Sequence, residues 1–280
     1  MRQHEAVIGD DELRAGATRL AEVGGVVAVL LGGSRARGEH TTESDVDLGL
    51  YYRPPLDVPA LAALARELAG PAAGVTEPGA WGPWVDGGAW LTLAGTAVDW
   101  IYRDLDRVHA AWRDAVAGRY AFHAQAGHPL GVPEFAYAGE VALGVVLADP
   151  TGELTQLREQ TQVYPARLAH ALVAGLWEAS FLLDVARKAV SRGDTTYVAG
   201  CLFRVVGLCA HALHGRAGRW LINEKGAVAA AGRLAVAPAG FAEQAHGLLA
   251  APGRSPQALA TVLDDAADLV ARTRAACEAP

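Results

Sequence analysis

Two aspartates separated by a single apolar residue are the first feature of this sequence that could do chemistry. Asp45 and Asp47 flank Val46, and Leu48 follows. Side chains alternate along a β-strand, so both carboxylates would lie on one face, with Val46 and Leu48 on the other. Adjacent carboxylates repel each other, and a cation bound between them removes this cost. Oxygen ligands of this kind favour a hard cation such as Mg²⁺.

A glycine-rich turn precedes these aspartates. The apolar stretch 26–31 is rich in β-branched residues and runs into Gly32-Gly33, which predicts a buried strand that ends in a turn. With no side chain at Gly33, the backbone amides of Gly33 and Ser34 can bind an anion, and the Ser34 hydroxyl adds a donor. Arg35 comes next, and its guanidinium suits phosphate. An anion-binding turn so close to a carboxylate pair suits a nucleoside triphosphate with its metal ion.

A third carboxylate, Asp99, lies between Val98 and Trp100 in a second apolar stretch, 97–102. If this strand lies beside strand 45–52, Asp99 faces the same site. There it would hold a second metal ion or accept the proton of an attacking hydroxyl group. Each motif alone is commonly an ordinary turn or a solvated strand face. Together and in this order, they predict a site.

The elements around these residues change character along the chain. Helices are expected over 10–21 and 57–68, and strands over 26–31, 45–52, 97–102 and 144–147. A hairpin is expected between 84–85 and 89–93, with its turn at 86–88, before a second turn at 94–96. After Gly152, helices are expected over 169–185 and 195–213 and near Glu224, Phe241 and Pro256. The sequence therefore predicts an α/β (α+β) domain with a mixed sheet at 1–152, followed by an all-α helical bundle domain at 153–280.

Composition narrows the possible functions. The 280 residues are 51% hydrophobic and 20% charged, which is enough apolar surface for a packed core and excludes an intrinsically disordered chain. The net charge of −7 disfavours binding to long nucleic acids. There is no uninterrupted apolar run of about 18 residues, and the first residues lack a signal-peptide pattern. We therefore expect a cytoplasmic protein that has no membrane contact, while its oligomeric state stays open.

Gly33-Ser34, Asp45, Asp47 and Asp99 together resemble the signature of the DNA polymerase beta-like nucleotidyltransferase superfamily. Within it the chain looks most like adenylyltransferases of the kanamycin and streptomycin type, which add a helical carboxy-terminal domain. The resemblance makes 1–152 the catalytic domain and 153–280 a helical domain that binds substrate and nucleotide. One departure concerns the base, which is often a glutamate in the antibiotic-modifying members and is Asp99 here. The resemblance therefore does not extend to an antibiotic acceptor.

The resemblance implies transfer of a nucleotidyl group, most often AMP from ATP, to a hydroxyl group of a small molecule, with release of pyrophosphate. Asp45, Asp47 and Asp99 would hold magnesium, with two ions expected and Mn²⁺ able to substitute. Asp99 would also activate the acceptor. Gly33 and Ser34 would hold the outer phosphates.

Two basic residues of the helical half are further candidates for binding the triphosphate. Lys225, one of only two lysines, lies near a predicted helix start, where related helical domains offer a lysine; it is otherwise a surface lysine. Arg204 is expected to reach phosphate. With His211 it also loosely resembles the Arg-x-His signature of HEPN ribonucleases, although Val205 stands where a polar residue is usual.

Two further points stay open at this level. Tryptophans gather around the third carboxylate, where they would stack on a base or an acceptor ring or else pack the sheet; they are Trp81, Trp84, Trp90 and Trp100.

The alternative function is regulatory. In that case the chain would be a nucleotide-binding, antitoxin-like protein with a HEPN-related helical domain, or one that modifies a protein or a tRNA end.

Overall fold

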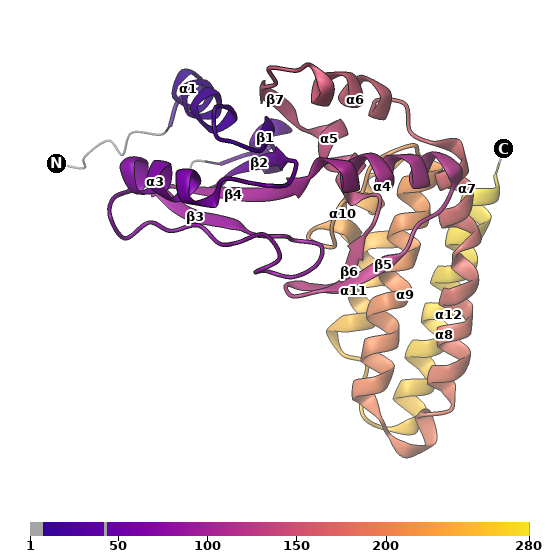
Figure 1. The fold of residues 1–280 in the computed structure, drawn as a ribbon. Helices are drawn as coiled ribbons and strands as arrows, with labels where there is room; N and C mark the ends of the chain where they lie inside the picture. Colours follow the sequence, from indigo (N-terminus) through magenta and orange to yellow (C-terminus); the bar gives the residue numbers. More distant parts are fainter. Residues whose placement is uncertain (1–7, 42–43, 280) are drawn as a thin grey trace. The chain divides into compact units, whose positions relative to one another are not determined.

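The computed structural model describes residues 8–41 and 44–279 (Figure 1). Contacts divide these residues into two compact units. The first comprises 8–41, 44–113, 125–127 and 134–163, and the second comprises 114–124, 128–133 and 164–279. By this division, residues 153–163 lie in the first unit, while two short segments before residue 152 lie in the second.

A five-stranded sheet forms the middle of the first unit. Its strands are β1 (Val26–Leu31), β2 (Val46–Tyr52), β3 (Gly88–Leu93), β4 (Thr96–Asp104) and β7 (Val145–Ala148). Their order across the sheet is β3-β4-β2-β1-β7. Strands β2 and β4 are parallel, whereas the other neighbours are antiparallel. The predicted mixed sheet is therefore confirmed.

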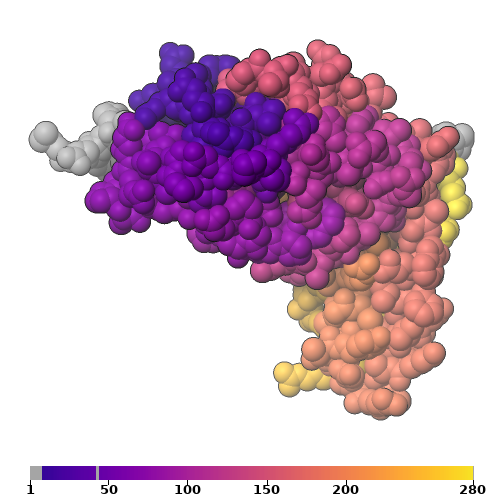
Figure 2. Space-filling model, in the orientation of Figure 1, coloured from indigo at the N-terminus to yellow at the C-terminus, as the bar shows by residue number. Residues whose placement is uncertain are grey.

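Helices cover both faces of this sheet. They are α1 (Asp10–Ala21), α2 (Gly33–Ala36), α3 (Val58–Ala69), α4 (Leu105–Ala117), α5 (Ala136–Leu143) and α6 (Glu153–Thr161). Leu20 of α1 and Leu61 of α3 share one buried apolar cluster with Trp100 of β4. Leu105 of α4 and Leu154 of α6 belong to another cluster, which forms on the other face. Figure 2 shows the surface of this unit, from indigo at its first residues to pink at residues 145–163.

The predicted hairpin is wrong in its register and position. Residues 84–85 form no strand, and the hairpin instead joins β3 to β4 through the two-residue turn Ala94-Gly95, at the place of the second predicted turn, 94–96. Both turn residues have positive φ, +48° at Ala94 and +84° at Gly95, which matches the right-handed twist of the flanking strands. The sequence analysis also missed a two-stranded sheet made by β5 (Phe122–Gln125) and β6 (His128–Pro133).

Apart from β5 and β6, the second unit is helical, and the helical carboxy-terminal region that the sequence predicts is confirmed. Its helices are α7 (Ala166–Ala174), α8 (Leu176–Arg187), the 3-10 turn η1 (Val190–Arg192), α9 (Thr195–Arg216), α10 (Ala227–Gly232), α11 (Phe241–Ala250) and α12 (Pro256–Glu278). The two long helices start at caps, because Asp194 accepts a hydrogen bond from the Tyr197 amide and Ser255 accepts one from the Ala258 amide. α8, α9 and α12 pack against one another around a buried apolar core (Figure 1).

Two helical stretches of the second unit, 166–187 and 195–216, are long and apolar enough to cross a membrane. The buried core helix of a globular domain meets the same criterion, and 61% of the apolar window in 195–216 is buried within the structure. The stretches therefore do not indicate where the protein is located.

The cysteines, Cys201, Cys209 and Cys277, are free and buried, as expected for small apolar residues.

Candidate nucleotidyl-transfer site

Asp47 and Asp99 lie directly opposite each other on neighbouring strands. The parallel register of β2 and β4 pairs Asp47 with Asp99, and it pairs the flanking residues Val46 with Val98 and Leu48 with Trp100. These flanking residues are buried against α1 and α3, so both carboxylates lie on the other face of the sheet. There each carboxylate is half-buried. The two strands are therefore neighbours, which is the condition that the sequence analysis set for Asp99 to face this site.

Asp45 lies one residue before β2, since the strand begins at Val46 rather than at Asp45 as predicted. Its side chain is exposed, but its charge still acts on Asp99. Burial raises the pKa of Asp99 to about 6, and the negative charges of Asp47 and Asp45 add to this rise. The three aspartates are therefore close enough to repel one another. A bound cation would reverse that repulsion.

The glycine turn lies against Asp47. The amide of Gly32 donates a hydrogen bond of 2.8 Å to the backbone carbonyl of Asp47, which fixes the turn at the start of β2. Gly33 has a φ of +61°, and a Cβ atom there would overlap Oδ2 of Asp47. Only glycine meets both conditions without strain. Gly33 and Ser34 open α2, and Gly33 brings the start of this helix against the carboxylate of Asp47. Anion binding by the two backbone amides stays a prediction.

Arg35 follows in the same short helix and keeps unused donors. Its Nη1 donates to the carbonyl of Ile8 at 3.4 Å. Its Nε and Nη2 atoms are buried and have no hydrogen-bond partner among the residues that the structure describes. Buried guanidinium donors are costly to leave unpaired, and an anion such as phosphate would satisfy them.

The donor set fits magnesium when part of the shell comes from the substrate. Within residues 8–41 and 44–279, no three side chains of His, Cys, Asp or Glu gather closely enough to hold a metal ion by themselves. Mg²⁺ is usually held by one or two carboxylates, and phosphates and water complete its octahedron. Asp47 and Asp99, which face each other beside a glycine turn, match this requirement, and Asp45, whose charge acts on Asp99, is a further candidate.

Arg204 and Lys225 belong to the second unit. Nε of Arg204 donates to Oε1 of Glu178 at 2.5 Å, and its guanidinium carbon lies 5.4 Å from the centre of the Phe122 ring. Lys225 is exposed in the turn before α10, where its amide donates to the side chain of Asn223 at 2.9 Å. Arg204 therefore has an internal carboxylate partner, whereas Lys225 is accessible to a ligand. Their contact with a triphosphate stays a prediction.

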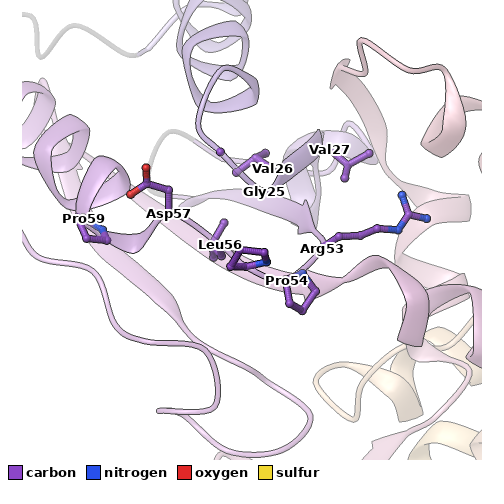
Figure 3. A pocket seen from close by; sticks show the side chains of 10 residues that line it. Gly25, Val26, Val27, Arg53, Pro54, Leu56, Asp57 and Pro59 are labelled. Atoms are coloured by element: carbon purple, nitrogen blue, oxygen red, sulfur yellow. The ribbon is translucent and has the colours of Figure 1, made fainter.

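An open cavity of about 810 Å³ lies away from the carboxylates, at the opposite ends of β1 and β2 (Figure 3). Its charged lining residues already have partners. Arg53 binds Glu153 at 2.6 Å and Asp106 at 3.0 Å, and Asp57 caps α3 by accepting from the Ala60 amide. The cavity therefore offers little for chemistry, and the functional site is better placed at the aspartates.

Comparisons with known proteins match two parts of the chain to family models. Residues 13–74 match the family model of a nucleotidyltransferase domain, a range that includes the glycine turn, Asp45 and Asp47. Residues 134–225 match a domain of unknown function, DUF4037. No curated protein matches the chain. The solved structures that match include a nucleotidyltransferase-like protein from Exiguobacterium sibiricum 255-15. It is 13% identical, the match covers 94% of this chain and 74% of that chain, and the TM-score is 0.48.

Proposed function

We propose that this chain, which carries a nucleotidyltransferase domain of the DNA polymerase beta-like superfamily, transfers AMP from ATP to a hydroxyl group of a small molecule and releases pyrophosphate. The observation that carries the proposal is the register of β2 and β4, which sets Asp47 opposite Asp99 beside a turn that only glycine can form. The domain supports nucleotidyl transfer in general. ATP as the donor and a small molecule as the acceptor are the parts of the proposal that go beyond this domain.

The carboxylates have two tasks in this proposal. Asp45 and Asp47 hold magnesium, and Asp99 either completes the binding of a second ion or accepts the proton of the acceptor hydroxyl. Bound magnesium would neutralise charge on the phosphates as the α-phosphorus is attacked. The acceptor oxygen forms a bond to that phosphorus while the bond to the bridging oxygen breaks. The hydroxyl proton passes to Asp99, and pyrophosphate leaves.

The remaining residues position the triphosphate. α2 begins at Gly33 against Asp47, where the amides of Gly33 and Ser34 would bind the outer phosphates. Arg35 follows with two buried donors that have no partner within the described part of the chain. Lys225 and Arg204 are proposed to contribute positive charge from the second unit. Catalysis would come mostly from positioning and from electrostatic stabilisation, because the protein forms no covalent intermediate. A cytoplasmic location, which supplies ATP and magnesium, is part of the proposal.

The test replaces Asp47 with Asn, which keeps the shape of the side chain and removes its charge. Purified chain is incubated with ATP, Mg²⁺ and a metabolite extract, and pyrophosphate is measured. We expect Asp47→Asn to reduce release at least about 1,000-fold, because it removes a ligand that acts on charge at the reacting centre. Its circular dichroism spectrum and Tm should stay those of a folded protein.

Asp11→Asn is the matched control, since Asp11 is an exposed aspartate in the first turn of α1. It should release pyrophosphate like the original chain. Calorimetric titration with ATP should show binding in Mg²⁺ or Mn²⁺ and none in EDTA. Unchanged turnover in Asp47→Asn would overturn the proposal. Metal-dependent ATP binding without pyrophosphate release, with any acceptor in a broad panel, would favour the regulatory function instead.

A further inference from the structure

Trp90 is an unusually exposed aromatic side chain beside the candidate site. It lies on β3 and is 71% exposed, whereas its neighbours Ala89 and Leu91 are buried in the cluster beneath α1 and α3. Alternation along the strand therefore puts Trp90 on the face that carries the aspartates. The antiparallel register of β3 and β4 pairs Trp90 with Asp99 directly.

A second tryptophan supports Trp90 from one side. The rings of Trp81 and Trp90 are stacked, with centroids 4.3 Å apart and planes 12° from parallel. Gly88 lies next to the Trp81 ring: a Cβ atom there would be 3.2 Å from that ring, and it would also overlap the backbone carbonyl of Trp100, so the position requires glycine. We call Trp81 and Trp90 the tryptophan platform. Since Trp81 covers one face of the Trp90 ring, the exposure of Trp90 lies on its other face and edge.

The platform is held in place before any ligand binds. The side-chain amide of Gln125 donates to the carbonyl of Trp81 at 2.8 Å, and its oxygen accepts from the amides of Trp84 and Val85 at 3.0 and 3.1 Å. Arg107 also donates to the carbonyl of Pro83, at 2.6 Å. These bonds fix the loop that carries Trp81, so stacking a ligand on Trp90 requires little further ordering.

The order of side chains across the sheet indicates whether the platform contacts the nucleotide or the acceptor. Asp47, Asp99 and Trp90 form a row over β2, β4 and β3, with neighbouring strands about 4.8 Å apart, and Gly33 adjoins Asp47 at the start of the row. In phosphoryl-group displacement the attacking and leaving oxygens lie roughly in line, on opposite sides of the phosphorus. With pyrophosphate leaving toward Gly33, the acceptor hydroxyl arrives from the Trp90 side.

From this arrangement, which rests on the proposed function, we infer that Trp90 is the specificity residue of the acceptor subsite and that the acceptor is a hydroxylated ring with one apolar face. The ring stacks on the open face of Trp90 and presents a hydroxyl group to Asp99 on the adjoining strand. Saturated sugar or cyclitol rings and aromatic rings share this chemistry. An open-chain polyol lacks the flat face, so the platform discriminates against it.

The experiment measures ring binding separately from turnover. Saturation-transfer NMR is recorded on the full chain with Mg²⁺ and a non-hydrolysable ATP analogue. The probes are myo-inositol, its open-chain counterpart sorbitol, and catechol as the aromatic arm. We expect ring probes to bind and sorbitol to bind at least about tenfold more weakly. Trp90→Ala should weaken ring binding about tenfold, while Trp90→Phe should stay within about threefold of the original chain.

Trp177→Ala is the matched control, because Trp177 is 64% exposed but lies on α8 of the second unit. It should change neither ring binding nor ATP binding. The inference is overturned if Trp90→Ala binds rings as tightly as the original chain, or if the original chain binds no ring in preference to sorbitol. It is also overturned if Trp90→Ala weakens the binding of the ATP analogue alone, because the platform would then hold the base.

These results are distinguishable from failure of the proposed function. If the platform assignment is wrong, the original chain still releases pyrophosphate with a metabolite extract and Asp47→Asn still abolishes that release. If nucleotidyl transfer is wrong, the original chain releases none. For an acceptor found with the extract, Trp90→Ala should raise its KM about tenfold and leave the KM for ATP unchanged.

Discussion

Acidic side chains near the two ends of strand β4 have opposite electrostatic environments. At one end, Asp99 faces Asp47, and burial together with neighbouring negative charge raises its pKa to about 6. At the other end, four residues along the same face, Arg103 binds Glu140 through two hydrogen bonds of 2.6 and 2.7 Å. Beyond it, hydrogen bonds from Arg53 lower the pKa of Glu153 to about 2.

This contrast separates carboxylates that stabilise the fold from carboxylates whose charge would be stabilised only by a bound cation. The lowered pKa of Glu153 means that its ionised form stabilises the folded state. Glu140 supplies the counter-charge of the buried Arg103, whose charge would be costly without it. Every influence on the pKa of Asp99 disfavours its charge, so its ionised form destabilises the unit. Such an arrangement is expected where stability is given up for function.

The largest effects are expected from Asp99→Asn, which should separate activity from stability. Loss of the proposed base should lower kcat about 10² to 10⁴-fold. The same change removes a repelled charge, and because water screens much of the repulsion at this partly exposed side chain, we expect a gain of about 1 kcal/mol in the free energy of unfolding. Urea denaturation in EDTA at pH 8 measures the gain. A loss of stability there would contradict the contrast.

Glu140→Gln should do the opposite at the other end of β4. It leaves the guanidinium of Arg103, only 7% exposed, without its counter-charge, which should lower the free energy of unfolding by about 3 kcal/mol. Glu67→Gln is the matched control, because Glu67 forms an exposed ion pair with Arg19, and its urea midpoint should not move. Equal midpoints for Glu140→Gln and Glu67→Gln would show that the buried pair contributes nothing.

The alternation of residues predicts the faces of the strands but not their neighbours. The pattern around Asp47 and Asp99 was sufficient to put both carboxylates opposite the apolar side chains, as the structure confirms. Their direct pairing depends on two strands about 50 residues apart in sequence, and no local signal specifies which strands meet. The roles of these aspartates, and of Gly33, Ser34 and Arg35, stay predictions.

The place of Trp90 was available from the sequence but was missed. Choosing Asp86-Gly87-Gly88 as the hairpin turn paired strand 89–93 with 84–85, although the second expected turn, at 94–96, already led into strand 97–102. The dipeptide Ala94-Gly95 between two apolar runs is the shorter connection, and counting outward from it pairs position 90 with position 99. By contrast, the partners of Arg103 and Arg204 lie on helices whose packing only the structure reveals.

The dependence of stability on pH should have opposite signs for the two kinds of carboxylate. The folded-state pKa of Asp99, about 6, lies above its ordinary 3.8, so its contribution to stability is present below about pH 3.8 and is lost as the pH rises through 6. The folded-state pKa of Glu153, about 2, lies below 4.5, so its contribution is present above 4.5 and is lost as the pH falls toward 2.

Chemical denaturation in EDTA from pH 2 to 8 checks both windows. The stability difference between Asp99→Asn and the original chain should grow between pH 4 and 7, whereas that for Glu153→Gln should shrink below 4.5. Because both groups are partly exposed, each difference should be about 1 kcal/mol. If both variants gave profiles of the same sign, the two ends of β4 would not differ as we argue.

The smallest expected effect tests whether the second unit follows the same contrast. Arg204 is already neutralised by Glu178, whereas Lys225 is exposed, so Lys225 is the better candidate to contribute a free positive charge. Lys225→Ala should weaken ATP binding several-fold, measured by calorimetry with Mg²⁺, because an ammonium group lost from a phosphate removes a charge-assisted hydrogen bond. Lys188→Ala, the other lysine, is exposed after α8 and should leave ATP affinity unchanged. Equal affinities in both variants would make Lys225 a surface lysine and would leave ATP binding to the carboxylates and the glycine turn.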